Sequence, residues 1–226
     1  LPDLNLFFFN GLGGFTADGR EYVITTGPAK HTPSPWVNVM SNPDFGTMVS
    51  ESGSGFTWFG NSQRNRLTRW SNDPVLDPPA EVVYLRDDQT GDSWTTPPLP
   101  IRKAHPCRVR HGAGYTLFER HSFGIGQELR LFVPNNDTGG DPIKFQQLSL
   151  RNDTDRWREL SLLYYVELTL GEHRETAHMH TVTRWEWDSS TLLAYNRYHP
   201  EYPERVTFVT LDPVPDSYTG DRTAFI

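Results

Sequence analysis

The sequence predicts an all-β protein whose strands form antiparallel sheets packed as a sandwich. Short runs of alternating apolar and polar residues recur along the chain, and turn-forming residues separate them about every ten positions. Gly and Pro each occur 18 times among 226 residues, which exceeds their ordinary usage. No segment has a convincing helical periodicity, so a helical domain is not expected.

The clearest expected strands lie in the middle of the chain. Residues 81–86 alternate and end at the turn-forming residues 87–91, which predicts a hairpin. Residues 115–120 and 127–133 flank a Gly-Ile-Gly turn and predict the next hairpin. The remaining expected strands are 143–150, which turns at 152–155 and pairs with a long strand over 159–170, then the pair 181–188 and 192–196, and finally 205–211.

The segment 26–79 has a different composition. It is rich in Pro, Gly, Ser and Asn, and it contains Trp36, Trp58 and Trp70. We expect a long loop without regular structure of its own, and such loops are usually functional or disordered. The aromatic and arginine content argues against disorder. Because no linker divides the chain, we expect a single β-sandwich domain over residues 1–226.

Composition excludes several classes of protein. The net charge of −7, from 21 Lys and Arg against 28 Asp and Glu, argues against binding nucleic acid. No apolar run is long enough to cross a bilayer, so no membrane partner is expected. The single cysteine, Cys107, excludes a disulfide framework and a cysteine-based metal cluster. With no signal peptide in the sequence, we expect a cytoplasmic location.

Residues 53–70 combine aromatic rings, amides and guanidinium groups within eighteen positions. An aromatic ring covers the apolar face of a sugar, while Asn, Gln and Arg hydrogen-bond its hydroxyl rim. Arg also binds phosphate through its planar fork. The alternative is a structural loop whose aromatics close the end of the sandwich and whose arginines pair with Asp73 and Asp77.

Three histidines, His173, His178 and His180, form a second cluster. If residues 178–180 are a strand, His178 and His180 point to the same face and have a spacing that suits a divalent metal. No third ligand is evident, so we predict no metal site. The alternatives are a polar strand edge or hydrogen-bonding partners in a ligand groove.

No catalytic residue is assigned from the sequence. A glycosidase needs two facing carboxyl groups, and nothing pairs any two of the candidates. A serine nucleophile elbow, a phosphate-binding P-loop and a dinucleotide fingerprint are all missing. The scattered carboxylates are Glu51, Asp73, Asp77, Glu167 and Glu172, of which Asp73 and Asp77 precede prolines and are typical of turns.

Several motifs resemble a known family. They are residues 8–15 (FFNGLGGF), 19–24 (GREYVI), 32–39 (TPSPWVNV), 50–55 (SESGSG), 61–68 (NSQRNRLT), 70–75 (WSNDPV) and 84–87 (YLRD). Together they resemble the N-terminal β-sandwich domain of glycoside hydrolase family 94. That family holds cellobiose, cellodextrin, chitobiose and 1,2-β-oligoglucan phosphorylases, and the likeness extends to the phosphorylase-like region of cyclic β-1,2-glucan synthases.

The resemblance implies a super-sandwich like that of galactose mutarotase. In the family this domain precedes an (α/α)6 barrel, which protonates the leaving oxygen through an Asp while inorganic phosphate attacks the anomeric carbon. The chain is therefore expected to be an N-terminal segment of a longer phosphorylase or glycosyltransferase, without catalysis of its own and without a cofactor. Phosphate would be a co-substrate of the parent enzyme.

The resemblance also implies where the domain meets the acceptor sugar. An aromatic contact falls at or near Phe59, after Trp58, and a second, often basic contact falls near His180, where this sequence has His in place of Arg. The expected partners are a β-glucan oligosaccharide, the C-terminal barrel and a possible homodimer. With the polar residues proposed above, the candidate substrate-binding residues are Trp58, Phe59, Asn61, Arg64, Arg66 and His180.

Two other functions stay open. A mutarotase-like epimerase would need a His general acid and a Glu general base in the concave groove of the sandwich, and His178 or His180 with Glu167 are the candidates. A purely structural domain would pack on its barrel and hold a homodimer without touching sugar.

Overall fold

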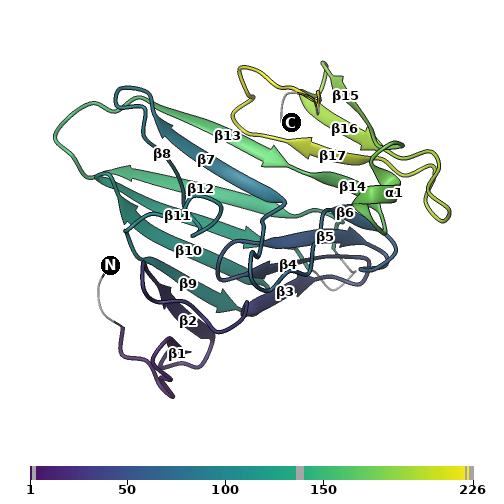
Figure 1. Ribbon diagram of the computed structural model, residues 1–226. Helices are drawn as coiled ribbons and strands as arrows, with labels where there is room; N and C mark the ends of the chain where they lie inside the picture. The colour runs from purple at the N-terminus through teal and green to yellow at the C-terminus, as the bar shows by residue number, and fades with distance from the viewer. Residues whose placement is uncertain (2–3, 136–139, 222, 224–226) are drawn as a thin grey trace.

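The computed structural model describes residues 1, 4–135, 140–221 and 223. This part of the chain is built from antiparallel strands, so the all-β prediction is confirmed (Figure 1). The helix found there, α1 (Arg174–Ala177), is a single short turn. Among the described residues, no helix combines the length and the apolar character needed to cross a membrane.

A six-stranded sheet forms one layer of the sandwich. The predicted hairpin of 115–120 and 127–133 forms its fourth and fifth strands. Its turn is Phe123 and Gly124, with φ values of 53° and 75°, because Ile125 and Gly126 of the expected Gly-Ile-Gly turn belong to the second strand. Two consecutive positive φ values are typical of the tight turns that join paired strands. In spatial order the strands are β1 (Gly13–Phe15), β2 (Glu21–Thr26), β9 (Cys107–Gly112), β10 (Tyr115–Ser122), β11 (Ile125–Phe132) and β12 (Phe145–Asn152).

The second layer contains a five-stranded sheet, most of which comes from residues 26–79. The prediction of a long loop without regular structure is therefore wrong. The alternation of apolar and polar residues is hidden in β4 (Phe45–Ser50), because this strand is buried on both faces and places Thr47 and Ser50 in the interior. In spatial order this sheet contains β14 (Leu168–Gly171), β6 (Arg66–Thr68), β5 (Gly55–Phe59), β4 (Phe45–Ser50) and β3 (Val37–Ser41).

A three-stranded sheet completes the second layer, in the order β13 (Leu160–Val166), β7 (Glu81–Asp87) and β8 (Ser93–Thr95). The predicted hairpin at 81–91 is confirmed by the pairing of β7 with β8. The expected partnership of 143–150 with 159–170 is wrong. Residues 159–170 form two strands in different sheets, since β13 pairs with β7 and β14 pairs with β6.

The C-terminal part adds a separate three-stranded sheet. The predicted pairing of 181–188 with 192–196 and the last strand over 205–211 are both confirmed. The strands are β15 (Val182–Glu186), β16 (Thr191–Tyr195) and β17 (Thr207–Thr210), in that spatial order. Figure 1 shows this sheet beside β14 and α1, at the end of the molecule away from β1.

The core lies between the layers in two clusters. The larger one packs Val109, Phe118 and Leu129 of the six-stranded sheet against Met40 and Phe45 of the five-stranded sheet. The smaller cluster packs Ile125 of the six-stranded sheet against Leu85 and the fully buried Trp94. Burying such apolar surface stabilises the sandwich by roughly 25 cal/mol per Å².

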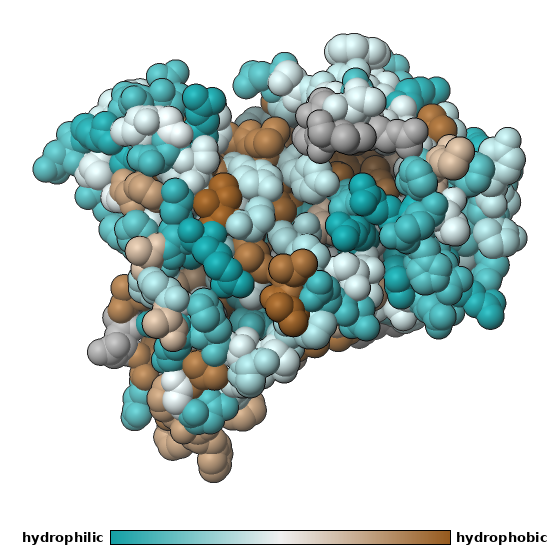
Figure 2. Space-filling view, viewed as in Figure 1, coloured by the Kyte–Doolittle hydropathy of each residue, from teal (hydrophilic) through white to brown (hydrophobic). Residues whose placement is uncertain are grey.

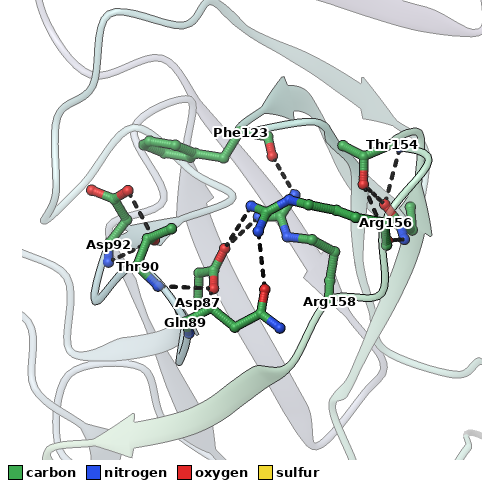
Figure 3. A network of polar contacts seen from close by, with 9 residues as sticks. Asp87, Gln89, Thr90, Asp92, Phe123, Thr154, Arg156 and Arg158 are labelled. Carbon is green, nitrogen blue, oxygen red and sulfur yellow. Dashed lines mark hydrogen bonds and ion pairs between the residues drawn. The ribbon is translucent and has the colours of Figure 1, made fainter.

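A buried ion pair joins the β7–β8 hairpin to the loop that precedes β13 (Figure 3). Arg158 donates to the Asp87 carboxylate at 2.6 Å and to the carbonyl oxygen of Phe123 at 2.7 Å. Burial opposes ionisation of Asp87, but the bonds from Arg158 and from the amides of Gln89 and Thr90 outweigh it and lower its pKa. The network therefore holds three connections together: the turn after β7, the loop before β13 and, through Arg158, the turn at Phe123.

Gly46 on β4 gives room to the candidate residue Trp58. A Cβ atom at Gly46 would lie 2.3 Å from Cζ2 of the Trp58 ring. We expect Gly46→Ala to lower the free energy of unfolding by about 1–3 kcal/mol, because the indole must move. Urea unfolding measures the change. Gly27→Ala is the control, since a Cβ there meets nothing within 4 Å, and equal stability of both variants would contradict the close contact.

Candidate functional site

Three connections between strands meet at one end of the molecule and include three of the six candidate residues, Asn61, Arg64 and His180. They are the β5–β6 loop at 60–65, the β14–β15 connection at 172–181 and the β16–β17 connection at 196–206. Hydrogen bonds join the first to each of the others: Gln63 donates to the carboxylate of Glu172 at 3.3 Å, and His199 contacts the carbonyl oxygen of Arg64. We call this region the loop rim.

The β5–β6 loop is held by its own side chains. The Asn61 carboxamide oxygen accepts from the backbone amides of Gln63 and Arg64, both at 2.9 Å, which is the geometry of an Asx turn. Gly60 has a φ of 70°, and a Cβ there would lie 2.7 Å from the hydroxyl of Tyr202. The candidate Asn61 is therefore exposed, and its carboxamide oxygen holds the shape of the loop.

Phe59 points toward the β16–β17 connection. Its ring lies edge to face with Tyr202, with centroids 5.9 Å apart, and the Arg205 guanidinium lies 5.0 Å from its centroid. The side chain is half-buried and also packs against the larger core cluster. Two other side chains therefore cover Phe59, and only part of its ring is open to a ligand.

Arg64 is exposed and pairs with Glu201 at 3.0 Å. The expected alternative, in which the loop arginines pair with Asp73 and Asp77, is wrong for Arg64. Asp73 instead accepts from the amides of Val75 and Leu76, as expected of a turn former. With 66% of its side chain exposed, Arg64 retains guanidinium donors for a ligand.

Trp58 and Arg66 lie on the other face of the sheet from Phe59, because neighbouring residues of a strand point to opposite sides. They are directly opposite each other in the β5–β6 pairing. The Arg66 guanidinium lies 5.6 Å from the centroid of Phe56 and donates to the carbonyl oxygen of Ser62 at 3.2 Å. The six candidates are thus divided between two faces of one sheet end.

The histidine cluster does not form a strand. His173 is the N-cap of α1, His178 is its C-cap, and His180 lies in the following turn. The expectation that His178 and His180 share a strand face is therefore wrong, because a helical turn occupies this segment. In the described part of the chain, no group of three or more His, Cys, Asp or Glu side chains has a geometry for a metal ion.

The β16–β17 connection supplies residues that sequence reasoning missed. Asn196 is buried and donates to the carbonyl oxygen of Leu170 at 3.0 Å. His199 is buried, and its Nδ1 accepts from the amides of Glu201 and Tyr202. Residues 196–205 also combine aromatic, amide and guanidinium side chains, as residues 53–70 do, and that signal would have identified them.

A groove of about 1430 Å³ runs up to the loop rim. It opens between β12, β13 and β17, and Figure 2 shows a hollow with apolar side chains at its floor. Phe59, His199 and Tyr202 line its end at the rim. Small-ligand pockets usually measure roughly 300–1,000 Å³, so this groove has room for a ligand larger than one sugar.

One wall of the groove carries a charged pair, Glu81 and Lys144. Burial disfavours the charged carboxylate, but Lys144 and the neighbouring hydroxyl donors outweigh it and hold the pKa of Glu81 below its ordinary value. Burial and then the Glu81 charge raise the pKa of Tyr164 well above its ordinary value. Its neighbours therefore hold the carboxylate ionised and fixed in the wall of the groove.

The proposed acid–base pair of an epimerase lies outside the groove. In the described structure, neither His178, His180 nor Glu167 lines it. Glu167 instead binds two guanidinium groups, Arg69 at 3.3 Å and Arg174 at 2.6 Å. The loop rim therefore offers aromatic faces and hydrogen-bonding groups, which suit binding rather than proton transfer.

Comparison with known proteins identifies a family model and several relatives that match this chain. A family model described as glycosyl hydrolase 94, supersandwich domain, matches residues 20–226. A cyclic beta-(1,2)-glucan synthase NdvB of Rhizobium meliloti (strain 1021) is 35% identical over 98% of this chain and 8% of its own length. An N,N'-diacetylchitobiose phosphorylase of Vibrio proteolyticus is 28% identical over 95% of this chain and 27% of its own length.

A third relative, a solabiose phosphorylase of Paenibacillus borealis, is 25% identical over 96% of this chain and 28% of its own length. The three alignments cover 95–98% of this chain. The chain spans less than a third of the length of each relative.

Proposed function

Since the chain belongs to glycosyl hydrolase family 94 through its supersandwich domain, we propose that it is the sugar-contacting domain of a glycoside phosphorylase or glycosyltransferase. Its substrate would be a β-linked glucooligosaccharide, and its loop rim would contact the acceptor part of that sugar. Catalysis would take place in a separate (α/α)6 barrel of the parent enzyme, with inorganic phosphate as the co-substrate.

One observation supports the proposal most. Polar and aromatic side chains from three distant connections converge beside an open groove, with exposed donors such as Arg64 at its end. Sugars are bound by aromatic faces together with fixed hydrogen-bonding groups. Because Asn61 and His199 hold the loops by backbone hydrogen bonds, little conformational entropy would be lost on binding.

The residues of this chain would bind and orient the sugar. Arg64 would donate to sugar hydroxyls, and the exposed part of Phe59 would cover an apolar face. The loop rim would take no part in general acid or base catalysis. The domain would instead raise the affinity for the oligosaccharide and fix its position, while the barrel cleaves the glycosidic bond. The partners are then the oligosaccharide, the barrel and a second copy of the parent.

The test is a titration of the chain with β-1,2- and β-1,4-linked glucotriose, followed by NMR. We expect chemical-shift changes at the loop rim, and we expect Arg64→Ala to weaken binding about tenfold through the loss of charged donors. Arg151→Ala is the matched control, since Arg151, like Arg64, is an exposed arginine that pairs with a carboxylate, in this case that of Asp153.

Two outcomes would contradict the proposal. If neither trisaccharide shifts the signals of the loop rim, the domain has only a structural or dimerising role. If the chain alone, supplied with inorganic phosphate, releases glucose 1-phosphate from these sugars at a robust rate, the assignment of catalysis to a separate barrel is wrong.

A further inference from the structure

Tyr198 is the aromatic side chain of the loop rim that is most open to solvent. It is 77% exposed, whereas Phe59 is half-buried beneath Tyr202 and Arg205. Trp58 is half-buried on the other face of the sheet against Gly46. Tyr198 therefore has more of its ring open to a ligand than either of these two candidates.

The backbone that carries Tyr198 is held on both sides. Its amide donates to the Asn196 side-chain oxygen at 3.0 Å, and Asn196 is itself bonded to the carbonyl oxygen of Leu170. On the other side, the buried His199 ring accepts from two backbone amides and contacts the carbonyl oxygen of Arg64 at 3.3 Å. Two buried polar side chains thus anchor the turn that presents an exposed ring.

The Tyr198 ring is also supported from a second segment. Its centroid lies 4.7 Å from that of His180, with 39° between the planes. The backbone of His180 is fixed in turn, since its amide donates to the carbonyl oxygen of Ala177 at 2.9 Å. The two rings therefore form one tilted aromatic surface built from the β14–β15 and β16–β17 connections.

We propose that Tyr198, supported by His180, is the stacking surface of this site and takes the apolar C–H face of a hexopyranose ring. The inference rests on the proposed function and adds a stacking residue that is more exposed than Trp58 and Phe59. Glu201, the ion-pair partner of Arg64, belongs to the same connection as Tyr198, so the loop rim offers hydroxyl partners of both kinds, donor and acceptor.

Stacking on a rigid ring needs its face rather than its hydroxyl group. In the same glucotriose titrations, we therefore expect Tyr198→Ala to weaken binding about tenfold and Tyr198→Phe to change it less than about twofold. Trp157→Ala is the matched control, because Trp157 is 84% exposed on the loop between β12 and β13. Circular dichroism and thermal melting check that each variant is folded.

The outcomes separate this inference from the proposed function. If Tyr198→Ala binds like the wild type while Arg64→Ala is weakened, the stacking surface is wrong and the sugar-contacting role stands. If no variant changes binding and no rim signal shifts, both fail. Saturation-transfer NMR on the unmodified chain gives an independent check, since sugar ring protons should receive magnetisation from Tyr198, and no transfer would overturn the stacking.

Discussion

Replacing Glu81 with leucine is expected to lower the free energy of unfolding by about 3–5 kcal/mol. The Glu81 and Lys144 side chains are 9% and 10% exposed, and Oε2 lies 2.6 Å from Nζ. Leucine would leave the Lys144 ammonium group buried without its carboxylate. An unpaired buried charge is far more costly than a neutral pair of the same size.

Glu81 also joins three sheets at one point. Burial raises its pKa, but the attraction of Lys144 and the hydrogen bonds outweigh this and lower it below the ordinary value of 4.5. The carboxylate therefore stabilises the fold above that value, and its contribution is lost as the pH falls through the lower, folded pKa. Its donors are Thr57 on β5, Thr68 on β6, Lys144, Gln146 on β12 and Tyr164 on β13.

Urea unfolding at pH 7 measures the effect, with a second variant to identify the cause. Glu81→Leu combined with Lys144→Met should recover most of the loss, because it removes both charges. Glu204→Leu is the control, since the Glu204 side chain is 87% exposed and pairs with the exposed Arg197, and such surface pairs contribute little. A Glu81→Leu variant as stable as the wild type would refute the buried ion pair.

Lowering the pH from 7 to 5 is expected to reduce stability by about 2 kcal/mol through His111 alone. Burial lowers the pKa of His111 to about 4 from 6.5, although its hydrogen bond to Trp36 opposes the change. Below pH 6.5 the unfolded chain binds a proton that the folded chain does not accept until about pH 4. Stability therefore falls as the pH drops through this window.

The comparison of His111→Gln with the wild type isolates this effect. Glutamine can keep partners at the Trp36 carbonyl and the Thr116 hydroxyl, which contact the two ring nitrogens of His111. We expect the variant to lose about 2 kcal/mol less than the wild type between pH 7 and pH 5 in urea unfolding. His31→Gln, on an exposed residue, serves as control. Identical pH dependence in wild type and His111→Gln would contradict the assignment.

The strands that could be predicted are those with one buried face and a local partner. The β10–β11 hairpin is an example, since its partners are neighbours in the sequence and its turn residues are recognisable. The strands at 37–68 were missed because β4 is buried on both faces, with Thr47 and Ser50 inside. A strand without an exposed face has no alternation to detect.

The candidate site could be predicted only where its residues are close in the sequence. Composition identified residues 53–70, but the partners of this loop are far away: Glu172 lies 106 positions from Arg66, and Glu201 lies 137 positions from Arg64. The cover on each side chain was also beyond prediction. Adjacent strand residues such as Trp58 and Phe59 must point to opposite faces, but the cover over Phe59 comes from the distant Tyr202 and Arg205.

By itself, the sequence determined the all-β class, most of the hairpins and the family, because alternation, turn residues and long motifs are properties of neighbouring positions. Only the tertiary structure decided which sheet each strand joins, that Phe59 is covered and that Tyr198 is open. Those features depend on contacts between distant segments. Such segments pair so that the whole sandwich is closely packed and its backbone hydrogen bonds are satisfied. This pairing leaves no periodic signal in the sequence.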